Sequence, residues 1–235
     1  MRVSACAPAV VLCALLAPPA DAADLTLDTL LFGSLDAGAA TFVTAGAKVA
    51  LDRLDRTGFV ALASVGGGRR TEKTGCVCHP TLSRYTALGS ALVGYQWVHD
   101  WGVVAAYAGP EGSVEILGDA GAVAVLPARF GLRVHGEVWA RPTEQTLLTA
   151  TLIAGSARSD AWGRIAWGHR LWGAYLGPEA SLYTDHTGYR KWAVGLHATD
   201  FSLGRYSFRV SGGLQGESSE RRAAPYVSLS AWAPL

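Results

Sequence analysis

Two segments of the chain carry the same Tyr-x-Gly-Pro-Glu motif, at Tyr107–Glu111 and Tyr175–Glu179. Alternate residues of an extended strand share a face, so the tyrosine, glycine and glutamate of each copy lie on one side. The proline lacks a backbone donor and indicates a bend or bulge in the strand. Hydrolysis of a glycosidic bond requires two carboxylates that flank it. Glu111 and Glu179 are the residues that could form such a pair.

A structural role explains the same two carboxylates. The residues that follow each motif on the same parity are polar, and Arg129, Arg133 and Arg209 alternate with apolar residues in other segments and are suitable counterions. The interior of a membrane barrel is polar, and opposite charges there satisfy one another. We therefore expect interior structure first, ligand contact second and catalysis third. The candidate ligand-contacting residues are Tyr107, Glu111, Tyr175, Glu179, Arg129, Arg133, His135, Glu137 and Arg209, and none is predicted to be catalytic.

Motifs for other chemistry are missing. The sequence contains no G-x-S-x-G, no H-E-x-x-H, and no P-loop or dinucleotide fingerprint. His99-Asp100 and Asp185-His186 could suggest an Asp-His couple. Adjacent strand residues point to opposite faces, however, and both pairs are expected in loops, so a role in turns is predicted. Arg69-Arg70 and the run from Glu220 to Arg222 are expected to be solvated loop charges. We expect no cofactor.

Cys76 and Cys78 stand in Cys-Val-Cys-His, within the polar segment Gly66–Arg84. A metal site needs three or four ligands and only His79 is near, so no metal site is predicted. In an exported chain the cysteines could form a loop staple or an intermolecular link, although a ring closed over one residue would be strained. The alternative is that they have no specific role.

The N-terminus has the features of a secretory signal peptide. Arg2 is positively charged, Ala9–Ala17 is an apolar run ended by two prolines, and Ala20–Ala22 resembles a cleavage site. The run is too short to span a bilayer. We predict a signal peptide at 1–22 and a mature domain at 23–235.

The composition favours a membrane barrel. Half of the residues are hydrophobic and the mean hydropathy is +0.21, yet no run after the signal peptide approaches the roughly 20 apolar residues of a membrane-spanning helix. Apolar residues spread over alternate positions are typical of outer-membrane barrels. The net charge of +1 argues against nucleic acid as a partner.

Alternation with a period of two is the main signal along the chain. In the clearest segment, Arg205–Gln215, Tyr206, Phe208 and Val210 share one face, and the arginines share the other. Similar patterns and short polar turns predict an antiparallel up-and-down transmembrane β-barrel of about 12 strands, with 10 as the alternative. The other expected strands are Leu31–Leu35, Val43–Leu51, Gly58–Val65, Thr86–Trp97, Gly102–Glu111, Phe130–Arg141, Thr146–Ser156, Ala161–His169, Trp172–Tyr183, Tyr189–Thr199 and Ala224–Ala233.

A soluble β-sandwich or lipocalin-like barrel would alternate in the same way but would hide its apolar face. Tryptophans near the expected strand ends favour the membrane barrel, because they form interfacial girdles there. These residues are Trp97, Trp101, Trp162, Trp167, Trp172, Trp192 and Trp232.

Four short motifs resemble the cellulose biosynthesis protein BcsS family of proteobacteria. They are Leu31–Gly38, Gly94–Trp97, the two Gly-Pro-Glu strands and Tyr189–Gly195. The resemblance covers nearly the whole mature chain. It implies an accessory outer-membrane protein of cellulose synthesis or export, with no catalytic residue to assign.

Three hypotheses follow for function. The first is a non-enzymatic outer-membrane barrel that assists exopolysaccharide secretion as a conduit or an anchor. Its partners would be membrane lipid, a cellulose-like glucan and other export-complex proteins. The second is an outer-membrane enzyme that acts on lipid or glucan through Glu111 and Glu179. The third is a soluble periplasmic binding module.

Overall fold

The computed structural model describes residues 28–73, 81–119, 122–218 and 222–235. The expected signal peptide and the two expected loop cysteines, Cys76 and Cys78, lie outside these residues. The strands are β1 (Asp28–Ala37), β2 (Thr41–Ala50), β3 (Gly58–Lys73), β4 (Thr81–His99), β5 (Gly102–Asp119), β6 (Ala122–Val125), β7 (Arg129–Thr143), β8 (Thr146–Gly155), β9 (Asp160–Leu171), β10 (Ala174–Thr184), β11 (Arg190–Leu203), β12 (Tyr206–Glu217) and β13 (Ala224–Pro234).

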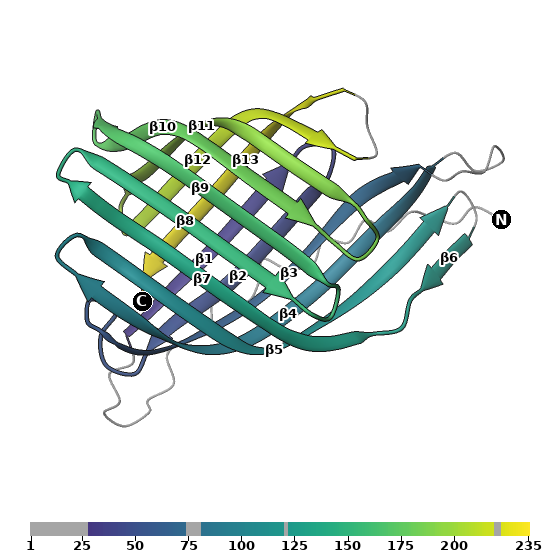
Figure 1. Ribbon diagram of the computed structural model, residues 1–235, viewed down its shortest axis with the longest axis horizontal. Helices are drawn as coiled ribbons and strands as arrows, with labels where there is room; N and C mark the ends of the chain where they lie inside the picture. The colour runs from purple at the N-terminus through teal and green to yellow at the C-terminus, as the bar shows by residue number, and fades with distance from the viewer. Residues whose placement is uncertain (1–27, 74–80, 120–121, 219–221) are drawn as a thin grey trace.

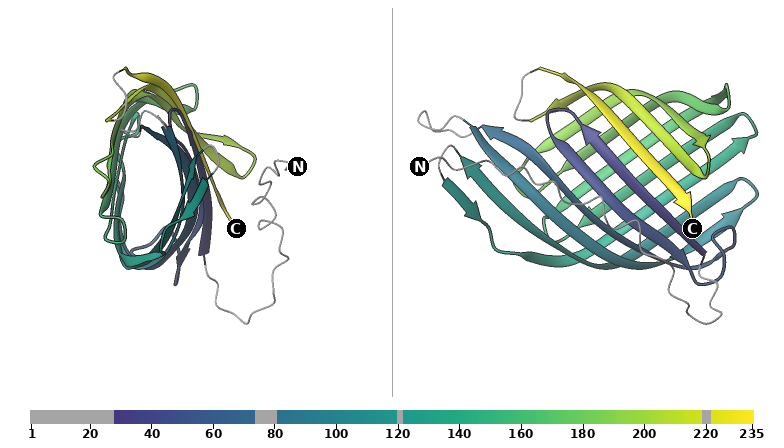
Figure 2. Two further views of the ribbon diagram at one scale, coloured as in Figure 1. Left: turned by 90° about the vertical axis from the view of Figure 1, so that its right-hand side faces the viewer. Right: turned by 180° about the vertical axis from the view of Figure 1, so that it is seen from behind.

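Twelve of these strands form a closed antiparallel barrel (Figure 1). Each strand pairs with the next along the chain, β5 pairs with both β4 and β7, and β13 closes the ring on β1. The prediction of an up-and-down barrel of about 12 strands is confirmed. Seen along its axis, the ring has a flattened cross-section, so two walls face each other (Figure 2, left). No helix in the described part of the chain is long and apolar enough to cross a membrane.

The two faces of the strands point as a membrane barrel requires. On β7, Phe130 and Leu132 point outward and are 82% and 69% exposed, whereas Arg133 between Leu132 and Val134 points inward. On β12, Val210 is outward and Arg209 is buried inside. A soluble barrel would show the reverse arrangement. The expected orientation of the apolar face is therefore correct.

The two ends of the barrel differ in their connections. At the end that carries residues 28 and 235, here called the termini end, the Leu235 amide donates to the Thr29 carbonyl oxygen at 2.9 Å. Four of the five connections there are two residues long. Trp172 and Gly173 both have positive φ, as type I′ turns require. The opposite end, here called the loop end, carries mostly longer connections, as on the outer side of outer-membrane barrels.

The motif glycines allow a close approach between strands. A Cβ on Gly109 or Gly177 would press on the main-chain carbonyl oxygen of Ala91 or Trp167 in the adjacent strand. The β4–β5 ladder is interrupted between the Ser90–Glu111 and Val93–Ala108 pairs. The expected bend therefore has a physical cause. Only glycine fits there, and the following proline cannot donate to the ladder.

Two expectations about the loop end are wrong. The polar segment Gly66–Arg84 is largely strand, since β3 continues to Lys73 and β4 starts at Thr81. Arg70, expected to be a solvated loop charge, is 8% exposed on the inner face of β3. The short strand β6 was not predicted, and it pairs only with β5, outside the ring.

The tryptophan girdles are confirmed for five residues and wrong for two. Trp97, Trp167 and Trp192 point outward near strand ends, and Trp101 and Trp172 lie in termini-end turns. Trp162 instead shares the inner face with its alternate neighbours, and Trp232 pairs with the inward Ser207.

Candidate functional site inside the barrel

Glu111 and Glu179 each occupy a separate ion pair on the inner face. The Arg133 guanidinium donates to Glu111 at 2.9 Å, and the Ala157 amide donates to the same carboxylate at 2.9 Å. Glu179 accepts from the Arg209 guanidinium at 2.5 Å. Two of the three expected counterions are thus in place. Arg129 forms an ion pair with neither glutamate within the described residues.

Tyr226 and Thr149 complete the second pair. The Tyr226 hydroxyl donates to the other oxygen of Glu179 at 2.8 Å, and the Arg209 guanidinium also donates to the Thr149 hydroxyl at 3.1 Å. Arg209 and Glu179 are 3% and 8% exposed. Neither carboxylate contacts the other among the described residues, so each is already committed to structure.

Three other expected site residues form a group with Lys48. The Lys48 ammonium lies 2.7 Å from a Glu137 oxygen, and the Tyr107 hydroxyl donates to that oxygen at 2.9 Å. His135 packs beside Tyr107, with ring centroids 5.5 Å apart. Because Lys48 is on β2 and Glu137 is on β7, this pair crosses the interior. Lys48 lies within the expected strand Val43–Leu51, and the sequence gives no sign that it pairs with Glu137.

The loop end holds a closed cycle of six alternating charges, here called the six-charge ring: Arg70, Glu72, Arg84, Glu115, Arg158 and Asp185. Arg70 contacts Glu72 at 2.6 Å and Asp185 at 2.5 Å. Arg84 lies 2.7 Å from Glu72 and 3.0 Å from Glu115. Arg158 lies 3.1 Å from Glu115 and 3.4 Å from Asp185.

The six-charge ring joins the two walls of the barrel. Four of its members are on the neighbouring strands β3, β4 and β5, whereas Arg158 and Asp185 come from the β8–β9 and β10–β11 connections. Its three positive and three negative charges balance. Sequence reasoning missed it because the partners are far apart in the chain; Arg70 and Asp185 are separated by 115 positions.

Asp185 is also the centre of its own turn. Its carboxylate accepts from the Thr187 amide at 2.9 Å and from the Tyr183 hydroxyl at 3.3 Å. The Arg70 guanidinium lies 4.3 Å from the ring centroid of Tyr189. Burial alone would raise the pKa of Asp185, but the hydrogen bonds from Thr187 and Arg70 outweigh it and hold this pKa below its ordinary value. The expected turn is correct, and it also anchors the loop.

One side of the interior toward the termini end is apolar. A buried cluster on β2 to β5 includes Val60, Leu62 and Leu92, with Phe32 of β1 packed against it. Trp139 of β7 and Trp232 of β13 meet edge to face, with ring centroids 5.7 Å apart. The walls therefore contact each other near both ends of the barrel.

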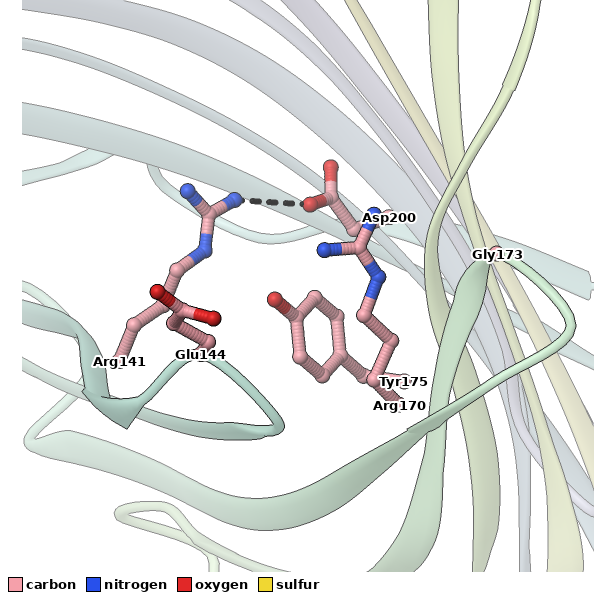
Figure 3. Close-up of a pocket in the computed structure, with 6 residues that line it drawn as sticks. All are labelled: Arg141, Glu144, Arg170, Gly173, Tyr175 and Asp200. Atoms are coloured by element: carbon pink, nitrogen blue, oxygen red, sulfur yellow. Dashed lines mark hydrogen bonds and ion pairs between the residues drawn. The ribbon is translucent and has the colours of Figure 1, made fainter.

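A polar pocket of about 360 Å³ opens at the termini end (Figure 3). Tyr175, an expected site residue, lies in it beside Arg170, and Arg141 donates to Asp200 across it at 2.8 Å. The sequence gives no sign that Arg141 and Glu144 share a pocket with Asp200. The pocket is lined by Arg141, Glu144, Arg170, Gly173, Tyr175 and Asp200.

Comparison with known proteins gives one family and several solved barrels. The model of the family described as cellulose biosynthesis protein BcsS matches residues 30–235. No curated protein matches the chain. The translocator domain of the autotransporter NalP from Neisseria meningitidis is 14% identical, with a TM-score of 0.48, covering 88% of each chain. The β domain of the Bordetella autotransporter BrkA is 12% identical, with a TM-score of 0.48, covering 89% of this chain and 99% of that one. A KdgM porin in complex with oligogalacturonate is 9% identical, with a TM-score of 0.44, covering 87% of this chain and 98% of that one.

Proposed function

Because the chain belongs to the cellulose biosynthesis protein BcsS family, we propose that it is a closed outer-membrane barrel that anchors part of the cellulose export machinery. In this proposal the barrel does not conduct the polymer and catalyses no reaction. The termini end, with its short turns, faces the periplasm and the loop end faces the outside of the cell, because outer-membrane barrels have short periplasmic turns and longer outer loops.

The outer surface supports the membrane location. Large apolar side chains such as Phe130, Leu132 and Leu196 project from the strands around the ring. Trp97 and Trp167 lie near one end and Trp192 near the other. Such an apolar band, bordered by aromatic residues, matches a lipid bilayer and its two interfaces.

Contacts across the interior support the proposal that the barrel has no open channel. The six-charge ring joins the walls at the loop end, Lys48 and Glu137 join them at mid-height, and Trp139 and Trp232 join them near the termini end. A polysaccharide conduit needs a continuous open path. Contacts at three levels leave this barrel better suited to anchoring than to transport.

A conductance measurement tests this proposal. Purified protein that migrates as a folded, heat-modifiable barrel is inserted into planar lipid bilayers. We expect no stable conductance steps above the membrane baseline at neutral pH, because ion pairs and aromatic contacts block the interior. Long-lived open steps in most insertions would contradict the closed barrel.

The non-enzymatic role has its own test. The double variant Glu111→Gln and Glu179→Gln keeps hydrogen-bonding side chains but removes both carboxylates. In a strain that lacks the native gene, and at equal amounts of heat-modifiable barrel in the outer membrane, we expect it to restore cellulose output to within about twofold of the wild-type protein, since neither group is proposed to react. Loss of output with normal barrel assembly would favour the enzyme hypothesis instead.

A further inference from the structure

The termini-end pocket is built from four strand ends and two turns. Arg141 and Arg170 lie near the ends of β7 and β9, Tyr175 lies near the start of β10, and Asp200 lies near the end of β11. Asp200 has a φ of +66° at an irregularity in the β11–β12 register. A bulge of this kind re-aims a side chain, and here the carboxylate reaches Arg141 across the pocket (Figure 3).

Several polar groups of the pocket are open to a ligand. Arg170 and Glu144 form no ion pair within the described residues, and both are exposed. Arg170 and Arg141 lie about equally far from the Tyr175 ring, at 6.0 and 5.9 Å from its centroid. The buried tyrosine thus lies within cation–π distance of both guanidinium groups.

The charge balance indicates what kind of ligand fits. An arginine only donates hydrogen bonds and a carboxylate only accepts them. The pocket has two arginines and two carboxylates, so it offers as many donor groups as acceptor groups. A sugar hydroxyl donates and accepts at once and can satisfy both. An anionic ligand would meet the carboxylates of Glu144 and Asp200, and a cation would meet the two arginines.

We propose that this pocket binds a short segment of a neutral glucan on the periplasmic side of the barrel. This proposal rests on the anchoring function proposed above. It adds that the component held by the barrel is the glucan itself. The volume of about 360 Å³ is at the small end of ligand pockets, which suits a few sugar rings rather than a threaded chain. The pocket opens at the termini end, where an exported polymer would first meet the barrel.

Binding of cellohexaose to the purified, detergent-solubilised protein tests the proposal. Asp200→Asn keeps a residue that tolerates positive φ, and Arg170→Gln keeps donors without the charge. We expect each change to weaken binding about tenfold or more, the loss expected for one hydrogen bond to a charged group. Arg205→Gln is the matched control, because Arg205 lies in an exposed turn at the same end and outside the pocket. Heat-modifiable migration confirms that each variant is folded.

The outcomes separate this inference from the proposed function. Equal binding by all variants, no binding by the wild-type protein, or binding only of a size-matched oligogalacturonate would each overturn the glucan site. If gene deletion lowers cellulose output while the wild-type protein binds no cellohexaose, the anchoring function stands and the pocket assignment fails. If the wild-type protein binds cellohexaose through Asp200 and Arg170 but deletion leaves output unchanged, the pocket stands and the function fails.

Discussion

Replacing Asp185 with alanine is expected to release the β10–β11 connection from the opposite wall of the barrel. Asp185 is the one member of the six-charge ring that contacts both Arg70 and Arg158. Its removal leaves three arginines against two carboxylates in a buried site. Removing one partner of a buried pair costs about 3–5 kcal/mol, because the remaining charge is left uncompensated.

Amide hydrogen exchange in the β10–β11 connection follows this release through the order of the loop. The His186 amide donates to the Arg158 carbonyl oxygen at 3.0 Å, so its exchange rate reports the contact between the two loops. A loss of about 3 kcal/mol corresponds to roughly a hundredfold faster exchange. Asp55→Asn, in an exposed pair with Arg53 at the termini end, should leave the His186 rate unchanged. Equal protection in both variants would show that the ring does not hold the loop.

Acid should loosen the same contact only at low pH. The pKa of Asp185 in the folded protein lies below its ordinary value of 3.8. A depressed pKa contributes stability that is complete above the unfolded value and is lost as the pH falls through the folded value. The His186 amide should therefore stay protected at pH 5 and lose this contribution only below about pH 3.8. Rapid exchange at pH 5 would contradict the pairing of Asp185.

The twelve strands of the barrel wall could be predicted because each has one face toward lipid and one face toward the interior. That constraint forces alternation with a period of two, visible in segments such as Phe130–Arg141. Glu111 and Arg133 could be matched because β5 and β7 are neighbours in the barrel. A local pattern is sufficient where the partner is on an adjacent strand.

The loop-end extension could not be predicted for the opposite reason. Gly66, Gly67, Gly68 and the two arginines that follow have the composition of a loop. They form strand because Arg70 is compensated by Asp185 from the far wall, and one sequence gives no sign of that contact. The inward position of Trp162 could have been predicted from the sequence, because Trp162 alternates with Asp160 and Arg164 and therefore shares their inner face.

Replacing Glu179 with alanine should destabilise the whole barrel rather than one loop. Glu179 and Arg209 are buried together between β10 and β12, and Tyr226 of β13 donates to the same carboxylate. Without Glu179 the hydrogen-bond partners left to the Arg209 guanidinium, in the part of the chain that the structure describes, are the neutral hydroxyls of Thr149 and Ser211. The expected loss in unfolding free energy is about 3–5 kcal/mol.

Guanidinium unfolding of the lipid-embedded barrel, followed by tryptophan fluorescence, measures this loss as a lower midpoint. The double variant Glu179→Gln and Arg209→Met removes both charges and leaves neither one unpaired. Its cost should therefore be clearly smaller than the sum of the costs of Glu179→Gln alone and Arg209→Met alone, because directly contacting residues do not act additively. Asp55→Asn should leave the midpoint unchanged, since both members of that pair are more than half exposed and solvent screens them. If the cost of the double variant equals the sum of the two single costs, Glu179 and Arg209 do not stabilise each other across β10 and β12 as their geometry indicates.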